Sequence, residues 1–192
     1  MMSVTVREYA APPFSVRDAL RYAGCRDMAD DVAALAKQCF DELREGLRYC
    51  VCYAELTVTV TGEKCDFGAF SVTSADLARY LGGCRRVVLF AATVGVAPDR
   101  LIQRYSRVSP SKALVMQAVG AERVEALCDA FCETLEGALP SRFSPGYGDL
   151  PLAVQKDVLR VLEADRRIGV CLGESLLMSP TKSVTAFVGI KG

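Results

Sequence analysis

The spacing of apolar residues changes along the chain, and each change predicts a different element. Apolar positions three or four residues apart predict long helices over about 27–49 and 110–135, each with one core-facing stripe. The stripe of the second helix is predicted to contain Leu114, Ala118, Ala121, Val124, Cys128, Phe131 and Leu135. Alternation over 50–60 predicts a half-buried strand, and the continuous apolar run 86–93 predicts a central strand covered on both faces.

Shorter elements are predicted from capping and turn residues. Strands are expected at 3–9, 70–73, 170–174 and 183–190. Helix starts are expected at Ser15, at Thr73 with Asp76, at Pro98, and at Asp149–Pro151 for a helix to about 164. Together these elements predict an α+β fold, a mixed α/β arrangement in which long helices pack on a largely antiparallel sheet. We expect a single domain over residues 1–192.

The composition narrows the class of function. The 192 residues are half hydrophobic, and 23 basic side chains balance 23 acidic ones without a long run of either sign. Nucleic-acid and acidic-membrane surfaces need a positive field, so neither kind of partner is expected. The N-terminus lacks a signal-like apolar segment, and no apolar run is long enough to span a bilayer. The expected protein is therefore soluble and cytoplasmic.

The sequence contains no histidine, which removes Ser-His-Asp and Cys-His catalysis and histidine-ligated zinc. No G-x-G-x-x-G segment occurs, and 181–183 lacks the glycine frame of a phosphate loop. The nine cysteines form no C-x-x-C pair and are best interpreted as small buried apolar residues. One alternative stays open, in which Cys50 with Cys52, or Cys128 with Cys132, supplies two thiolates to a metal.

The segment Arg142–Pro151 combines an arginine, a tyrosine, two prolines and two glycines. Prolines restrict the backbone, glycines let it approach a ligand, and a guanidinium can grip a carboxylate with two parallel hydrogen bonds. The segment also precedes a predicted helix, whose N-terminal amides around 148–150 favour negative charge. These features predict a preformed loop that binds a small ligand with an anionic group. The alternative is a rigid surface turn with a solvated arginine.

The same segment resembles a known family. Arg142-x-Ser144-Pro145-Gly146-Tyr147, followed by Pro151, resembles the R-x-x-P-G-Y segment of the activation domain of cobalamin-dependent methionine synthase. Residues 168–175 are similar to that domain's G-x-x-L-T-E-S segment, and residues 180–186 to its P-x-x-S-V-S-G segment. The resemblance is strongest over 142–190 and is closest to a stand-alone form of the domain.

The resemblance implies a function in methionine biosynthesis. Proteins of this family bind S-adenosylmethionine and use it to methylate cobalamin that has been oxidised to cobalt(II), with an electron from flavodoxin or a ferredoxin-type carrier. Cobalamin would come from a partner, either a methionine synthase module or another corrinoid protein, because the module that carries it needs a histidine. The chain would thus be an accessory subunit of a methyltransferase, with no catalytic residue or metal of its own.

The resemblance also assigns roles to individual residues. Arg142 would hold the methionine carboxylate, and Ser144 and Gly146 would present backbone to the ligand. Tyr147 would line the pocket, where an aromatic face favours a sulfonium by about 0.5–2 kcal/mol. Glu125, in a helical segment that matches the family, would bind the ammonium or another polar group of the ligand.

Some alternatives remain open at this stage. Glu125 is flanked by Glu122 and Arg123, so it could simply be a solvated helix residue. The family's tyrosine-rich C-terminal hairpin and its N-terminal acidic ligand residue have no match in this sequence. The protein could therefore be a non-catalytic module that binds S-adenosylmethionine while it docks on, or senses, a corrinoid protein.

Overall fold

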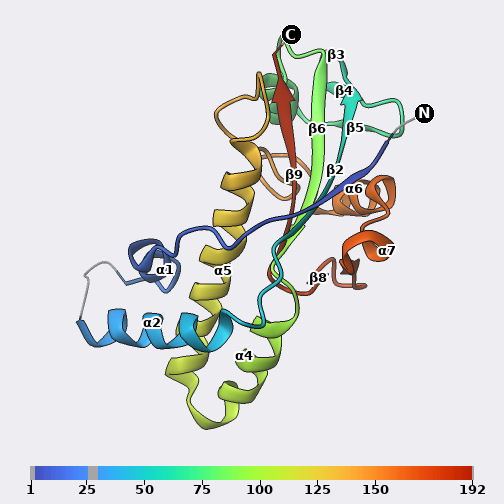
Figure 1. Ribbon diagram of the computed structural model, residues 1–192. Coiled ribbons are helices and arrows are strands. Elements are labelled where there is room, and N and C mark those ends of the chain that lie inside the picture. The colour runs from blue at the N-terminus through green and yellow to red at the C-terminus, as the bar shows by residue number, and fades with distance from the viewer. Residues whose placement is uncertain (1–2, 26–29, 192) are drawn as a thin grey trace.

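The main sheet is antiparallel throughout and supports the rest of the fold (Figure 1). The computed structural model describes residues 3–25 and 30–191. Within these ranges the strand order is β1 (Thr5–Glu8), β2 (Cys50–Thr57), β6 (Arg86–Thr93) and β9 (Ser183–Ile190). The α+β fold with a largely antiparallel sheet is therefore confirmed.

Strand β6 is buried on both faces, as its continuous apolar run predicts. Val87, Leu89 and Ala91 belong to one core cluster, and Val88, Phe90 and Ala92 belong to another on the opposite face. Successive side chains of a strand point to opposite faces, so such a strand needs apolar residues at every position. Strand β2 alternates in the same way, with Cys52 and Ala54 on the first face and Tyr53 on the second.

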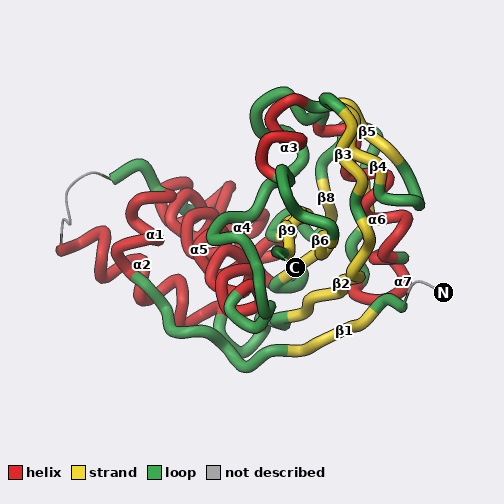
Figure 2. The backbone as a smooth tube through the Cα atoms, turned by 90° about the horizontal axis from the view of Figure 1, so that it is seen from above, coloured by secondary structure: helices red, strands yellow, loops and turns green. Residues whose placement is uncertain are grey.

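A group of four helices lies on one side of the sheet, where the longest of them packs directly on the strands and the other three pack around it (Figures 1 and 2). It consists of α1 (Val16–Tyr22), α2 (Asp30–Leu43), α4 (Ala97–Val108) and the long α5 (Pro110–Cys132). Helix α5 contacts the sheet and also the other three helices, so it is buried on several sides. Its buried set therefore differs from the predicted stripe: Leu114 is exposed, whereas Met116, Val119 and Leu127 are buried.

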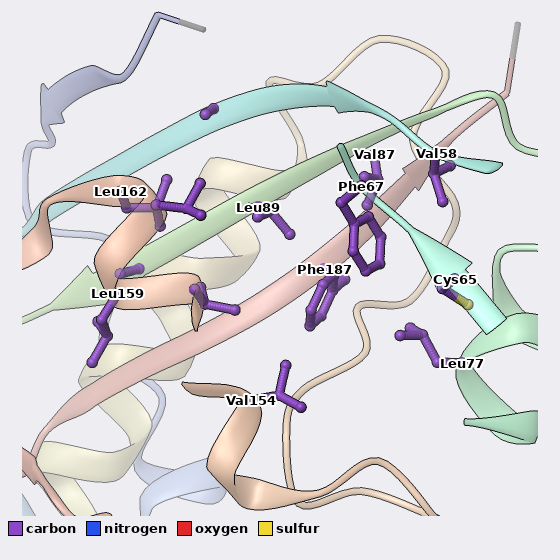
Figure 3. Close-up of a cluster of buried hydrophobic side chains, with 14 of the residues drawn as sticks. Val58, Cys65, Phe67, Leu77, Val87, Leu89, Val154, Leu159, Leu162 and Phe187 are labelled. Atoms are coloured by element: carbon purple, nitrogen blue, oxygen red, sulfur yellow. The ribbon is translucent and has the colours of Figure 1, made fainter. Parts of the chain in front are cut away.

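The opposite face of the sheet is covered by shorter elements. One group is a small sheet of β3 (Thr59–Thr61), β4 (Lys64–Asp66) and β5 (Ser71–Thr73), together with α3 (Ala75–Tyr80). The other group comes later in the chain and consists of η1 (Leu152–Val154), α6 (Gln155–Leu162) and α7 (Ala164–Ile168). Figure 3 shows their side chains meeting the sheet, with Phe67, Leu77 and Val154 directed towards Phe187. The rings of Phe67 and Phe187 lie 5.3 Å apart, centroid to centroid.

Several predicted boundaries differ from the structure. Helix α2 ends at Leu43 rather than 49, because the chain turns at Gly46, where an added Cβ would lie only 2.8 Å from Ala97 Cβ. The predicted start of α2 at residue 27 lies outside the described residues. The strand predicted over 50–60 breaks after Thr57, where the amide of Val58 donates to Arg85 O at 3.0 Å. Strand β4 was missed, since three residues give no periodic signal.

The C-terminal third also departs in detail. The cap of α3 is Ser74, not Thr73, and its hydroxyl accepts a hydrogen bond from the Leu77 amide. The helix predicted from 149 to 164 is divided into η1, α6 and α7, with a left-handed residue, Glu163 (φ 49°), between the last two. Strands β7 (Cys171–Leu172) and β8 (Met178–Ser179) form a hairpin shorter than the predicted strand over 170–174. Within the described residues, no helix combines the length and apolar character needed to cross a membrane.

Candidate functional site

The beginning of the Arg142–Pro151 loop is fixed against the outer edge of β9. Phe143 exchanges two backbone hydrogen bonds with Phe187, at 2.9 and 2.8 Å. The Tyr80 hydroxyl donates to Ser141 O at 2.6 Å and accepts from the Gly189 amide at 3.2 Å. The backbone on both sides of Arg142 is thus held by the sheet and by α3.

The end of the loop is fixed by Asp149, whose side chain caps the N-terminus of helix α3, a helix far away in the sequence. The Ser74 hydroxyl and the amides of Ala75 (2.7 Å) and Asp76 (3.2 Å) all donate to the Asp149 carboxylate. The hydrogen bond from Ser74, with those from the two amides, holds the pKa of Asp149 below its ordinary value against the opposing effect of burial. Gly148 has φ +53°, and a Cβ on it would overlap Asp76 Oδ2, so the loop requires glycine there.

The amides of this loop are largely used within the protein. The Gly146 amide donates to Leu150 O, the Leu150 amide to Tyr147 O, and the Asp149 amide to the Asp76 carboxylate. The helical segment that follows begins only at Leu152. The predicted anion site at a helix N-terminus around 148–150 is therefore wrong in its detail, and Arg142 remains the candidate group for an anion.

A cavity of about 500 Å³ opens between this loop, helix α5, the start of α6, strand β8 and the start of β9. Its lining residues are Glu125, Ser141, Arg142, Phe143, Ser144, Pro145, Tyr147, Gln155, Met178, Ser183, Val184 and Thr185. The structure therefore brings Glu125, Arg142, Ser144 and Tyr147 together in one cavity. Gly146 is not among the lining residues; it has φ +91° and serves the turn.

Arg142 is held by two carboxylates from helix α5. It forms ion pairs with Glu125, through Nη2, and with Asp129, through Nη1 at 2.5 Å. Burial opposes the charge of Arg142, but the hydrogen bond from Nη1 to Asp129 and the nearby charge of Glu125 outweigh it and raise the pKa. Glu125 is therefore not simply a solvated helix residue, and Arg142 is not a solvated cation on a surface turn. Asp129 had no role in the sequence-based assignment.

Several lining residues could not be assigned from the sequence. Gln155 is buried, and its side-chain amide donates to Leu176 O at 3.2 Å. Met178 lies in β8, a two-residue strand without a sequence signal. Ser183 and Thr185 belong to the 180–186 segment, which resembles a segment of the same family as the Arg142 loop. That shared resemblance was the one signal in the sequence that could have placed them in this cavity. The 168–175 segment instead contributes to a separate groove beneath α6 and α7.

The cysteines give no support to a metal centre. Among residues 3–25 and 30–191, no cluster of three or more Cys, Asp, Glu or His side chains could hold a metal ion. Burial raises the pKa of the Cys52 thiol to about 11, and it raises the pKa of the Cys128 thiol well above its ordinary value. Burial thus favours the neutral form of both thiols, as expected of small buried apolar residues.

No protein-family model matches the sequence, and no curated protein matches it. Among solved structures, the chain is similar to one described as the crystal structure of the MetH reactivation domain bound to AdoHcy. The TM-score is 0.74 at 14% sequence identity, and the match covers 98% of this chain and 78% of that one. An identity this low establishes a shared fold only. The chain has the α+β fold of the methionine synthase reactivation domain.

Proposed function

We propose that the protein binds S-adenosylmethionine in the cavity beside Arg142 and serves as the reactivation subunit of a separate methionine synthase or corrinoid protein. One observation carries this proposal. Glu125, Arg142, Ser144 and Tyr147 line a single cavity in a fold whose solved neighbour holds AdoHcy. The cavity also lies within the range of about 300–1,000 Å³ that small-molecule sites occupy.

The chemistry of the lining suits the three charged groups of the ligand. Arg142 offers a guanidinium to the carboxylate, and Glu125 offers a carboxylate to the ammonium. Tyr147 lines the cavity and is 69% exposed as a residue, so its ring would be the aromatic group available to the sulfonium.

The residues of this chain would bind and orient the methyl donor. A partner's cobalamin would supply the reaction itself. Its cobalt would accept one electron from a flavodoxin- or ferredoxin-type carrier and then the methyl group, and S-adenosylhomocysteine would be the other product. Arg142, Glu125 and the fixed loop would hold the sulfonium in place for that transfer. Holding two reactants in line converts a bimolecular step into a nearly unimolecular one, so placement alone accelerates it. Such a role in methionine biosynthesis would place the protein in the cytoplasm.

Calorimetric titration with S-adenosylmethionine tests the binding site. We expect wild type to bind and Arg142→Ala to lose at least about tenfold in affinity, the effect of losing one charge-assisted hydrogen bond. Arg86→Ala is the matched control, because Arg86 also pairs with a glutamate, Glu55 at 2.8 Å, but lies at the opposite end of the sheet. Equal binding by wild type and Arg142→Ala would refute the assignment of Arg142.

Electron paramagnetic resonance tests the reactivation step. The protein, S-adenosylmethionine, a reductant and a cobalamin-binding methionine synthase module in its cobalt(II) state are mixed, and loss of the cobalt(II) signal is measured. We expect the signal to disappear with wild type and to persist with Arg142→Ala. If wild type binds S-adenosylmethionine but the signal persists, the function is instead that of a non-catalytic module that docks on or senses a corrinoid protein.

A further inference from the structure

Arg142 lies between two hollows, and its two ion-pair partners lie on different sides. The cavity described above contains Glu125 but not Asp129. A neighbouring hollow of about 410 Å³, between the end of α5 and residues 138–142, contains Asp129 but not Glu125. Arg142 lines both. The hydrogen bond from Nη1 to Asp129 therefore draws one end of the guanidinium away from the cavity.

Each terminal nitrogen of Arg142 donates one hydrogen bond to a carboxylate of α5 in this arrangement. A ligand carboxylate is held best by two parallel hydrogen bonds from one edge of a guanidinium. The cluster also carries one positive and two negative formal charges, so it repels a third carboxylate. A carboxylate that enters the cavity is therefore bound best when one of the two resident acids gives up its hydrogen bond to Arg142.

Asp129 is the acid that is easier to replace. Its side chain is 65% exposed, against 35% for Glu125, so water can solvate its carboxylate once the hydrogen bond to Arg142 is broken. A third hollow, next to helix α1, is lined by Asp129 and Arg21, but Arg21 already pairs with Asp18 at 3.5 Å. A carboxylate released from Arg142 would therefore be stabilised mainly by solvent.

We propose that Asp129 is a positioning residue that competes with the ligand carboxylate for Nη1 of Arg142. This inference rests on the proposed binding of S-adenosylmethionine. Asp129 keeps Arg142 paired while the cavity is empty and lowers its affinity for ligands that carry a carboxylate. Glu125 keeps its place beside Nη2 and remains available to the ligand ammonium.

The test compares two ligands and two variants by calorimetry. The ligands are S-adenosylmethionine and its decarboxylated analogue, which lacks only the group that competes with Asp129. For Asp129→Asn we expect about two- to fivefold tighter binding of S-adenosylmethionine, the effect of freeing one exposed ion pair, and no tighter binding of the analogue. The matched control is Asp41→Asn, an equally exposed helical aspartate that pairs with Arg44 at 3.8 Å, and it should change neither affinity.

Each outcome decides between the two proposals. If wild type binds S-adenosylmethionine and Asp129→Asn binds it no more tightly, the competition is refuted while the binding site stands. If Asp129→Asn binds both ligands more tightly to the same degree, the competition is also refuted, because the gain would not depend on the carboxylate. If only Asp129→Asn binds, the competition is supported. If neither protein binds, both proposals fail. Asp129→Ser, which removes the same charge, must reproduce the result.

Discussion

Helix α5 carries two clusters of arginine with carboxylates, and they differ in what surrounds them. In the first, Arg123 is 0% exposed and Glu122 is 3% exposed. The guanidinium donates to Glu122 at 2.5 Å and to the carbonyl oxygens of Pro12 and Pro13 at 2.7 Å. Glu122 in turn accepts from the Ser15 amide at 3.1 Å. This cluster fastens the segment before α1 to the middle of α5.

Aromatic rings enclose the first cluster. Phe14 and Phe40 stack with centroids 4.3 Å apart, and Cζ of Arg123 lies 5.1 and 5.2 Å from the two rings. Every side of the guanidinium thus meets a partner from the protein. A buried charge is tolerated only when it is paired and hydrogen-bonded in this way.

The second cluster, Arg142 with Glu125 and Asp129, is open on two sides. The Arg142 side chain is 20% exposed and lines both neighbouring hollows. Both clusters pair an arginine with a glutamate of α5, and the second adds Asp129. They differ most in whether the protein supplies every acceptor and covers the pair. The covered pair joins two segments of the fold, whereas the open pair has space beside it for a ligand.

The largest expected effect comes from breaking the covered pair. Arg123→Met removes the cation and leaves the buried Glu122 carboxylate without a counter-charge, so we expect a loss of about 3–5 kcal/mol in the free energy of unfolding. Urea denaturation followed by circular dichroism measures it. The control is the double variant Glu122→Leu/Arg123→Met, which removes both charges and should recover most of the loss. A loss below about 1 kcal/mol in the single variant would mean that the pair is no more than a surface ion pair.

The second effect concerns the loop that carries Arg142. In Gly148→Ala, a Cβ at φ +53° would overlap the Asp76 carboxylate, and we expect a loss of about 2–3 kcal/mol from strain and overlap together. Gly62→Ala is the matched control, because Gly62 has φ +60° but no atom within 4 Å of its added Cβ. It should lose only about 1 kcal/mol. Equal losses in urea denaturation would show that Asp76 moves aside freely and does not fix the loop.

The third effect tests the open cluster directly. Arg142→Ala leaves Glu125 and Asp129 without their cation, but both reach solvent, so we expect a loss of only about 1–2 kcal/mol in the free energy of unfolding. The same variant should lose most of its affinity for S-adenosylmethionine. A loss in stability as large as that of Arg123→Met would remove the distinction between the two clusters.

Much of the fold could be predicted from the sequence because its strongest signals are local. The run 86–93 and the cap at Ser15 were placed correctly, since periodicity and capping depend on neighbouring residues. The alternation over 50–60 gave the right faces but not the break after Thr57, because β2 ends opposite Arg86, where its partner strand β6 begins, and that limit lies far away in the sequence. Leu114 was misplaced for a similar reason, since what covers each side of α5 depends on three other helices.

The candidate site could be predicted only in part. Glu125, Arg142, Ser144 and Tyr147 do line one cavity, although their role in binding a ligand remains a prediction. The ion pairs of Arg142 could not be foreseen, because they join a loop to a helix across a turn that the sequence does not define. Glu122 and Arg123 suggested a solvated helix surface, yet they are buried, because the segment before α1 folds over them.

The smallest expected effect is a pH dependence at the far end of the Arg142 loop. Because hydrogen bonds lower the pKa of Asp149 in the folded state, its carboxylate contributes stability at pH values above its unfolded pKa of about 4, and that contribution disappears as the pH falls through the lower folded pKa. Asp149→Asn cannot ionise. We therefore expect wild type to have the higher urea midpoint at neutral pH and the difference to shrink below about pH 4.

Asp41→Asn, at an exposed helical site, controls for the loss of one negative charge and should differ less from wild type at pH 7. A difference that stayed constant from pH 7 to pH 3 would show that the Asp149 side chain fixes the loop by shape rather than by charge. In that case packing, rather than the charge of Asp149, would hold this end of the loop that carries Arg142.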